Sequence, residues 1–277
     1  MIKKIFTKEQ YIEILKSKKL KRRSKCDKII SDKVINGMVN IHGFCQICKK
    51  QTKFYIDSLW LNNDTVNFRE RMGCPNCGLN NRQRFLLEWV LKAKKNRNNY
   101  QIFIYEQVTP LYNKFKEIYP KTIGSEYLGA EYSSGTVING IRHEDATCLS
   151  FSDDSFDLVL SLDVYEHIFD LEKGLKEAFR ILKPMGKMIF SIPFYPADDT
   201  TQKRAEIIDG KIIFLKEPQY HGNPVSEKGS LVVYDISWDC FDIIKKCGFS
   251  EVYMVAGYNR LTGNMGDPLL YFFEAIK

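Results

Sequence analysis

The stretch that decides the fold is EDATCLSFSDDSFDLVLSLDVYEHIFDLEKGLKEAFRILKPMGKMIFSIPF, residues 144–194. The apolar run FDLVLS (156–161) is followed by a helical pattern over 170–183 and by a second apolar run over 187–194. Pro184 and Gly186 are expected to end that helix, because proline lacks an N–H and glycine is flexible. Continuous apolar strands indicate burial on both faces under helices. The alternation predicts an α/β protein with a parallel, doubly wound sheet.

The same alternation continues in both directions. Strands are expected over 102–106, 122–128, near 141–145, near 251–257 and over 269–276, and helices over 110–119 and 237–247. Residues 195–235 interrupt the pattern, and Asp209-Gly210 between two apolar runs predicts a hairpin there.

The front of the chain differs in charge from the rest. Residues 1–100 contain 23 Lys and Arg against 8 Asp and Glu, whereas residues 101–277 contain 18 against 26. A basic amphipathic helix is expected over 7–24, with Tyr11, Ile14 and Leu15 on its apolar stripe, and a further helix over 81–95. The asymmetry suggests two modules. Lysine-rich surface helices can serve solubility alone, or can attract a polyanion or a phosphorylated substrate.

Four of the eight cysteines form two pairs, Cys45-x-x-Cys48 and Cys74-x-x-Cys77, separated by 25 residues. Two such turns complete a tetrahedron of thiolates around one zinc ion. The segment YIDSLW (55–60) supplies strand material for a ribbon. Four thiolates leave no open coordination position, so the zinc is predicted to be structural. A thiol-redox role for either pair lacks a thioredoxin-like context.

These observations predict a domain organisation. It has a basic helical segment (1–40), a zinc ribbon (41–80), a connecting helix (81–100) and an α/β domain (101–277) with an insert near 195–235. No apolar run reaches the ~18 residues needed to span a bilayer. The first residues, MIKKIFTKEQ, contain no signal-peptide core. We therefore expect no membrane span and a cytoplasmic protein.

The pattern EDATCLSF-x4-FDLVLS-x-DVYEH resembles the class I S-adenosylmethionine-dependent methyltransferases, in their small-molecule branch. The resemblance is strong over 144–194 and weaker over the rest of 101–277. It implies a Rossmann-like, seven-stranded methyltransferase sheet that ends in an antiparallel hairpin. It also implies S-adenosylmethionine as cofactor and S-adenosylhomocysteine as product.

The resemblance assigns cofactor-binding roles by position. Asp145 would accept the exocyclic amine of adenine, with Ala146 beside it, and Glu126 would bind the ribose diol, with Tyr127 next to it. The loop after 156–161 would line the pocket, since ligands of open α/β sheets bind at the carboxyl ends of the strands. Its lining residues would be Leu162, Asp163, Val164 and His167. Taken singly, Asp145 and Asp163 can also be read as helix or turn caps, and His167 as a polar residue under the sheet.

One loop departs from the family pattern. Relatives carry a glycine-rich loop after the first strand, where a Cβ would block close ligand approach. Here Val108 and Pro110 occupy those places. The cofactor contacts would then come from the side chains of Glu106, Gln107 and Thr109. Alternatively the fold is a scaffold that binds partners without catalysis.

The acceptor is expected to be a small molecule that can bear a sugar or a phosphate, methylated on oxygen or nitrogen in surface-glycan or specialised-metabolite biosynthesis. His221, in PQYHGNP (218–224), is the candidate general base because imidazole exchanges protons near neutral pH; it can equally pin its own loop. His167 and Tyr195 are further catalytic candidates.

A ribosomal RNA methyltransferase is the alternative enzyme. Its zinc ribbon would precede the catalytic domain, and the basic front would bind phosphates. Against it, the chain has no Asn/Asp-Pro-Pro-Tyr type motif for a flipped base.

Overall fold

The computed structural model describes residues 2–35, 37–59, 61, 65–93, 96–266 and 269–277. The chain clusters into two compact units, each described here by itself. One comprises residues up to 95 together with 254–272, and the other comprises 96–253 together with 273–277. The predicted basic helical segment, zinc ribbon and connecting helix thus lie in the first unit, which ends at residue 95 and not at residue 100. Residues 254–272 also belong to this unit.

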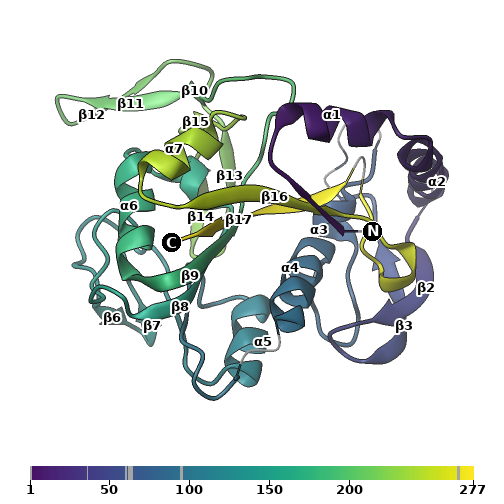
Figure 1. Cartoon of the computed structure of the whole chain (residues 1–277), viewed down its shortest axis with the longest axis horizontal. Coiled ribbons are helices and arrows are strands. Elements are labelled where there is room, and N and C mark those ends of the chain that lie inside the picture. The colour runs from purple at the N-terminus through teal and green to yellow at the C-terminus, as the bar shows by residue number, and fades with distance from the viewer. Residues whose placement is uncertain (1, 36, 60, 62–64, 94–95, 267–268) are drawn as a thin grey trace. The chain divides into compact units, whose positions relative to one another are not determined.

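The sheet is mixed and has seven strands in the order β1-β16-β17-β9-β8-β4-β5. The parallel strands are β4 (Ile102–Ile104), β5 (Thr122–Gly124), β8 (Phe156–Leu162) and β9 (Leu182–Ser191). Strand β17 (Leu270–Ile276) runs antiparallel to β9, and β16 (Glu251–Gly257) is its neighbour in the sheet. This is the Rossmann-like arrangement with antiparallel closing strands that the sequence predicted (Figure 1).

The seven strands are not the seven that the pattern indicates. Strand β1 (Ile2–Ile5) pairs with β16, although this segment was expected to be helical. The strand expected near 141–145 is instead β7 (Ile141–Arg142), which forms a hairpin with β6 (Val137–Ile138). Among the described residues, an isolated parallel bridge between Glu126 and His143 links this region to the segment after β5. Asn139 and Gly140 have positive φ angles of 51° and 80°, so a tight turn uses residues that would lengthen the strand.

Three helices belong to the second unit: α5 (Pro110–Ile118), α6 (Leu171–Ile181) and α7 (Cys240–Lys246). Leu171, Leu175 and Ala178 are buried along one face of α6, at helical spacing. This helix ends at Ile181, before Pro184 as predicted. Strand β9 begins at once with Leu182, five residues before the expected start at 187, so the proline lies inside a strand.

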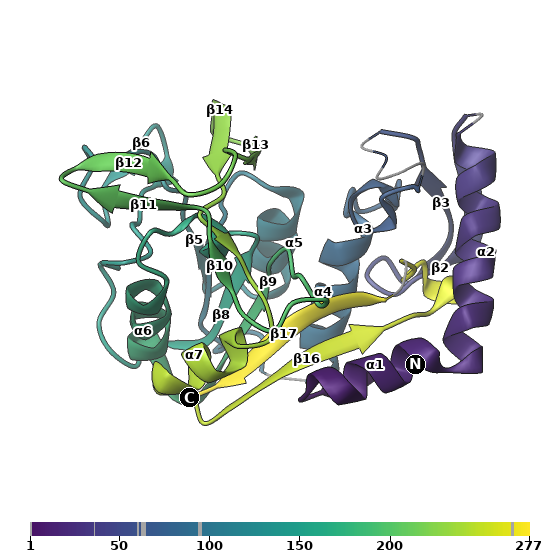
Figure 2. The same ribbon diagram turned by 90° about the horizontal axis from the view of Figure 1, so that it is seen from above.

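The insert consists of short antiparallel pairs. They are β10 (Gln202–Lys203) with β15 (Tyr234–Asp235), β11 (Ala205–Ile208) with β12 (Lys211–Phe214), and β13 (Tyr220–Asn223) with β14 (Ser226–Leu231). Asp209 and Gly210 both have positive φ, as a two-residue hairpin turn requires, which confirms that prediction. Figure 2 shows the β11–β12 and β13–β14 hairpins beyond the sheet.

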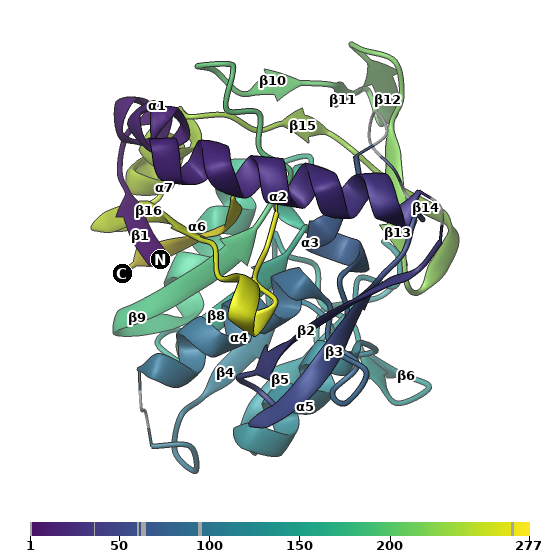
Figure 3. The ribbon, with the colours of Figure 1, turned by 90° about the vertical axis from the view of Figure 1, so that its right-hand side faces the viewer.

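The first unit contains α1 (Lys8–Lys16), α2 (Lys18–Val34), α3 (Phe68–Arg71) and α4 (Asn81–Lys92), with a hairpin of β2 (Val39–Cys45) and β3 (Lys50–Ile56). A single helix over 7–24 was wrong: Ser17 is extended at ψ 138°, ends α1 and caps α2 (Figure 3). Of YIDSLW, the first two residues lie in β3, and Trp60 is outside the described residues, as are positions 94–95 of the predicted helix 81–95. Among the helices that the structure describes, none is long and apolar enough to cross a membrane.

Candidate cofactor and metal sites

Glu126 lies just after β5, where the carboxyl end of a parallel strand places a ligand-binding residue. It is buried, and its Oε1 accepts backbone N–H groups from Gln107 at 2.6 Å and Val108 at 3.0 Å. Burial raises the pKa of this carboxyl above the ordinary value, against the two amide hydrogen bonds. Glu126, the residue predicted to bind the ribose, is thus hydrogen-bonded to the loop that follows β4.

The loop without glycines is held by its own side chains. Gln107 donates from Nε2 to the Gly140 carbonyl and accepts at Oε1 from the Arg142 amide, both at 2.8 Å. Thr109 caps α5 by accepting the Tyr112 amide at 3.2 Å. A Cβ on Gly124 would lie 2.6 Å from the carbonyl oxygen of Glu106. Gly124 on β5 therefore allows this strand to pack closely against the end of β4 and the loop that follows it.

Asp145 does part of the work of a turn cap. Its Oδ1 accepts both the backbone N–H and the hydroxyl of Thr147, each at 2.8 Å. Its second oxygen, Oδ2, has no hydrogen-bond partner among the residues that the structure describes, which leaves it able to accept an amine. Ala146, the other predicted adenine neighbour, is buried. Asp145 can therefore cap this turn and still accept a hydrogen bond from the adenine amine.

His143 was missed by the sequence reasoning. It is completely buried, and its Nδ1 accepts the Leu128 amide at 2.9 Å, so Nε2 carries the ring hydrogen. Within the described parts of the chain, that buried Nε2 has no partner. The rings of Tyr127 and Tyr132 lie 5.4 and 6.0 Å from the imidazole. The only indication in the sequence was that His143 lies two positions before Asp145, the residue predicted to bind adenine.

The loop after β8 turns sharply at Asp163. Its φ of 55° is in the left-handed region, which aspartate adopts more readily than most residues with a Cβ. Its amide donates to the Ser191 carbonyl at 2.8 Å, and its Oδ1 accepts the Ser191 hydroxyl at 2.9 Å. The flanking residues Leu162 and Val164 are half-buried. The turn leads directly into a single 3-10 turn, Tyr165–His167.

His167 and His221 are brought together with Glu166, although the two histidines are 54 positions apart in the sequence. The imidazole centroids are 5.2 Å apart, edge to face. Oε1 of Glu166 lies 3.6 Å from Nε2 of His167 and 3.5 Å from Nδ1 of His221. Glu166 was not selected from the sequence; its neighbour His167 in DVYEH was.

Hydrogen bonds between the insert and the loop after β8 create this cluster. His167 Nδ1 lies 2.7 Å from the Leu231 carbonyl, and the Val233 amide donates to the Glu166 carbonyl at 2.7 Å. The Tyr234 hydroxyl donates to the Phe169 carbonyl at 2.9 Å. The insert therefore supplies part of the site.

Tyr195, the third catalytic candidate, lies in a different polar group. Burial and the charge of Asp235 raise its pKa. Asp235 itself pairs with Arg204 at 3.0 Å and Lys216 at 2.8 Å. Tyr195 thus faces a network of charges in the insert.

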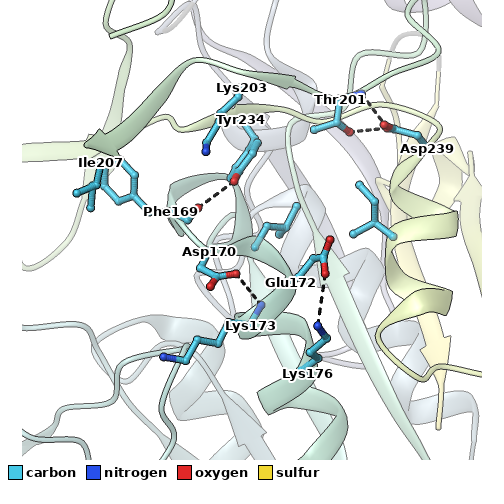
Figure 4. A pocket seen from close by; sticks show the side chains of 12 residues that line it. Phe169, Asp170, Glu172, Lys173, Lys176, Thr201, Lys203, Ile207, Tyr234 and Asp239 are labelled. Carbon is cyan, nitrogen blue, oxygen red and sulfur yellow. Dashed lines mark hydrogen bonds and ion pairs between the residues drawn. The ribbon is translucent and has the colours of Figure 1, made fainter. Parts of the chain in front are cut away.

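A cavity of about 810 Å³ opens elsewhere in the second unit, at the N-terminal end of α6. Its walls include Asp170, Lys173, Lys203, Tyr234 and Asp239, and no residue predicted for the cofactor or catalytic site lines it (Figure 4). The cavity is therefore not formed by the residues predicted to bind the cofactor or to catalyse transfer.

The four paired cysteines converge in the first unit. Their sulfur atoms all lie within 4.8 Å of one another, and Cys48 and Cys74 are 3.8 Å apart. A tetrahedron with Zn–S bonds of ~2.3 Å has edges of ~3.8 Å. The backbone N–H of Cys48 donates to the sulfur of Cys45 at 3.5 Å, as in a metal-binding turn. The geometry fits a tetrahedral metal ion.

Arg84 would offset the negative charge of four thiolates bound to zinc. It is completely buried and donates to the carbonyls of Met72, Leu79 and Gly263 at 2.8–3.0 Å. Burial lowers the pKa of its guanidinium, and the charges of Cys45, Cys74 and Cys77 oppose that lowering. Four thiolates around Zn²⁺ carry a net charge of −2, so a buried guanidinium beside them is electrostatically consistent.

Comparisons with known proteins agree with the resemblance. Residues 116–190 match the family described as "Methyltransferase domain". The matched region contains Glu126, Asp145 and the loop from Leu162 to His167. This part of the chain therefore matches a methyltransferase domain, as predicted.

Two curated relatives match over short segments. A "Demethylmenaquinone methyltransferase" of Clavibacter sepedonicus is 36% identical over 87 residues, 26% of this chain and 36% of that protein. A "Probable S-adenosylmethionine-dependent methyltransferase" of Mycolicibacterium smegmatis is 31% identical over 90 residues, 28% of this chain and 35% of that protein. The matches thus span about a third of each relative's length. A crystal structure of an S-adenosylmethionine-dependent methyltransferase from Mesorhizobium loti has a TM-score of 0.43 and 15% identity, covering 69% of this chain and 97% of that one.

Proposed function

We propose that the protein is an S-adenosylmethionine-dependent methyltransferase. The observation that carries the proposal is the methyltransferase-domain match over residues 116–190, together with the site residues gathered at the strand ends. Two carboxylates suit the two polar parts of the cofactor: Glu126 the ribose diol and Asp145 the adenine amine. The product would be S-adenosylhomocysteine.

The cofactor lies, in this proposal, along the loops after β4, β5 and β8. Leu162, Asp163, Val164 and Ala146 would form its walls. Glu106, Gln107 and Thr109 were proposed to replace the missing glycines by side-chain contacts. Since the polar atoms of Gln107 and Thr109 already hold the loop, backbone groups and Glu106 are the better candidates for contact with the methionine moiety.

The acceptor is proposed to be a small molecule with an oxygen or nitrogen nucleophile. The insert brings His221 to His167 beside the proposed methyl-transfer region, which supports a compact acceptor site. Methyl transfer is an in-line displacement at a sulfonium, so alignment supplies much of the rate and a base is needed only for a protonated acceptor.

Calorimetry with S-adenosylhomocysteine tests the enzyme. We expect binding of one equivalent, weakened by Asp145→Ala and unchanged by Asp153→Ala, which alters an exposed carboxylate in the same unit. No binding at millimolar ligand would contradict the enzyme and favour the partner-binding scaffold. Transfer of labelled methyl to small-molecule pools then identifies the acceptor.

We further propose that Cys45, Cys48, Cys74 and Cys77 hold a structural zinc ion. The sulfur spacing and the buried guanidinium of Arg84 support it. The ion would cross-link the β2–β3 hairpin to the segment before α4, and it would supply no reactive position.

Ribosomal RNA remains a second candidate acceptor because of one surface. Helix α2 exposes Lys18, Lys19, Lys21, Arg22, Lys25, Lys28 and Lys33. Phosphate contacts by such cations weaken steeply with salt. Salt-sensitive binding of ribosomal RNA, with labelled methyl transferred to it, would replace the small-molecule acceptor.

A further inference from the structure

The most unusual buried group of the second unit is the carboxylate of Glu166. Its side chain is 0% exposed, yet neither oxygen has a hydrogen-bond partner among the described residues. A buried carboxylate without compensation is costly, because its charge loses the solvation of water. Two imidazoles face it, from His167 and His221, and they are only 16% and 28% exposed. A cation among these three side chains would offset the charge of the carboxylate.

The tautomer of His167 sharpens this requirement. Its Nδ1 is 2.7 Å from the Leu231 carbonyl, which can only accept, so Nδ1 carries the hydrogen. In the neutral ring, Nε2 then presents a lone pair towards the lone pairs of Glu166. Two acceptors face each other unless a cation lies between them. Metal-binding histidines commonly donate one ring N–H to a backbone carbonyl, which orients the other ring nitrogen towards the ion.

The distances between these side chains are too long for direct hydrogen bonds and fit three ligands of one ion. The N–O separations of 3.5 and 3.6 Å exceed those of protein hydrogen bonds. One ligand atom from each residue lies within 4.8 Å of the other two. Ligands bound at ~2.1 Å to one ion are separated by ~3.4 Å in a tetrahedron, close to the observed values.

We propose that Glu166, His167 and His221 form a divalent transition-metal site, separate from the four-cysteine cluster. Two imidazoles and a carboxylate suit Zn²⁺, Fe²⁺, Co²⁺ or Mn²⁺, and three protein ligands leave positions open for a further ligand. The next step rests on the proposed methyl transfer. The acceptor oxygen would occupy the open position on the metal ion. The ion would lower the pKa of that hydroxyl so that its proton leaves to solvent. The oxygen would then bond to the methyl carbon as the methyl–sulfur bond of the sulfonium breaks, releasing S-adenosylhomocysteine. His221 then acts as a ligand and not as the general base.

Cobalt binding tests the site without relying on activity. Co²⁺ is titrated into protein already loaded with one equivalent of zinc at the four cysteines. We expect a further equivalent to bind with d–d absorption bands and without the sulfur-to-cobalt charge-transfer band that thiolates give. His221→Ala should weaken this binding at least tenfold, and Glu166→Gln should also weaken it. The matched control, His42→Ala, removes an exposed histidine and should bind as the parent does.

Two outcomes overturn the site: no second equivalent in the parent protein, or equal binding by His221→Ala and His42→Ala. Circular dichroism of each variant verifies folding. Because His221 is partly exposed on a hairpin, His221→Ala is not expected to unfold the protein. Calorimetry with S-adenosylhomocysteine is run in parallel. Cobalt binding without cofactor binding supports the metal site and contradicts the methyltransferase proposal. Cofactor binding without cobalt binding does the reverse.

Discussion

Glu126 has two tasks at the residue scale, since its carboxylate fixes the loop after β4 and is proposed to bind the ribose. Losing a charged hydrogen bond costs ~1.5–3 kcal/mol, so Glu126→Gln should weaken S-adenosylhomocysteine binding about tenfold or more. Calorimetry measures this, and Glu131→Gln, an exposed neighbour, serves as control. An unchanged dissociation constant in Glu126→Gln would remove this residue from the cofactor site.

The pH dependence of binding follows from the same carboxyl. Burial raises its pKa, so it takes up a proton at a higher pH than an ordinary glutamate. The charged form accepts the ribose hydroxyls. Affinity for S-adenosylhomocysteine should therefore be full well above the raised pKa and fall as the pH decreases through it. Glu126→Gln should abolish this step; a step that persists in the variant belongs to another group.

Gly124 tests the close packing of β5 against the following loop. A Cβ there would meet the Glu106 carbonyl and the ring of Tyr112, both at 2.6 Å. Overpacking of this kind costs ~1–3 kcal/mol, so Gly124→Ala should lower the free energy of unfolding in urea by that amount. Gly222→Ala is the matched control, because nothing lies within 4 Å of its added Cβ. Equal stability of the two variants would contradict the close approach.

At the scale of elements, Ser17 divides one basic segment into two helices. Its hydroxyl accepts the Leu20 amide at 3.3 Å, and its own amide donates to the Ile14 carbonyl at 3.1 Å. An N-cap serine replaced by alanine costs ~1 kcal/mol, so Ser17→Ala should destabilise the protein by about that much in urea unfolding. Ser17→Asp keeps an acceptor and should stay near the parent. A continuous helix would instead be stabilised by alanine.

Elements were predictable where the pattern is local. The runs at 156–161 and 251–257, the helix at 110–119 and the turn at Asp209-Gly210 coincide with observed elements, because apolar periodicity and turn chemistry act within a few residues. Strand β1 could not be recognised, because four residues of IKKI become a strand only through pairing with β16. The strand near 141–145 was lost to a local hairpin for the converse reason.

For the whole molecule, the proposed zinc ion gives the clearest prediction. Elemental analysis should find zinc bound by the cysteine cluster, and Cys77→Ser should lose one equivalent. Since the ion joins segments that are about 26 residues apart, its removal by a chelator should lower the midpoint of thermal unfolding. Cys26→Ser, an exposed cysteine outside the cluster, should retain the metal and the midpoint. Equal zinc content in the two variants would contradict the cluster.

The candidate site was predictable in part. The spacing of the two cysteine pairs predicted a cluster, and the family resemblance selected Glu126 and Asp145 as candidates. His143 and Glu166 were missed, because a buried polar group becomes informative only when its neighbours fail to satisfy it. Tyr195 was selected for proximity in sequence to the insert, yet it faces Asp235.

The sequence by itself determined the alternation of strands and helices, the two paired-cysteine motifs and the methyltransferase pattern, since each depends on residue spacing along the chain. Tertiary structure alone decided that β1 joins the sheet, that the loop without glycines is fixed by Glu126, and that His221 meets His167 and Glu166. These depend on hydrogen bonds between distant segments, chiefly those from Leu231 and Val233 to the loop after β8. No local pattern encodes such bonds, because they form only when the insert packs back onto the sheet edge.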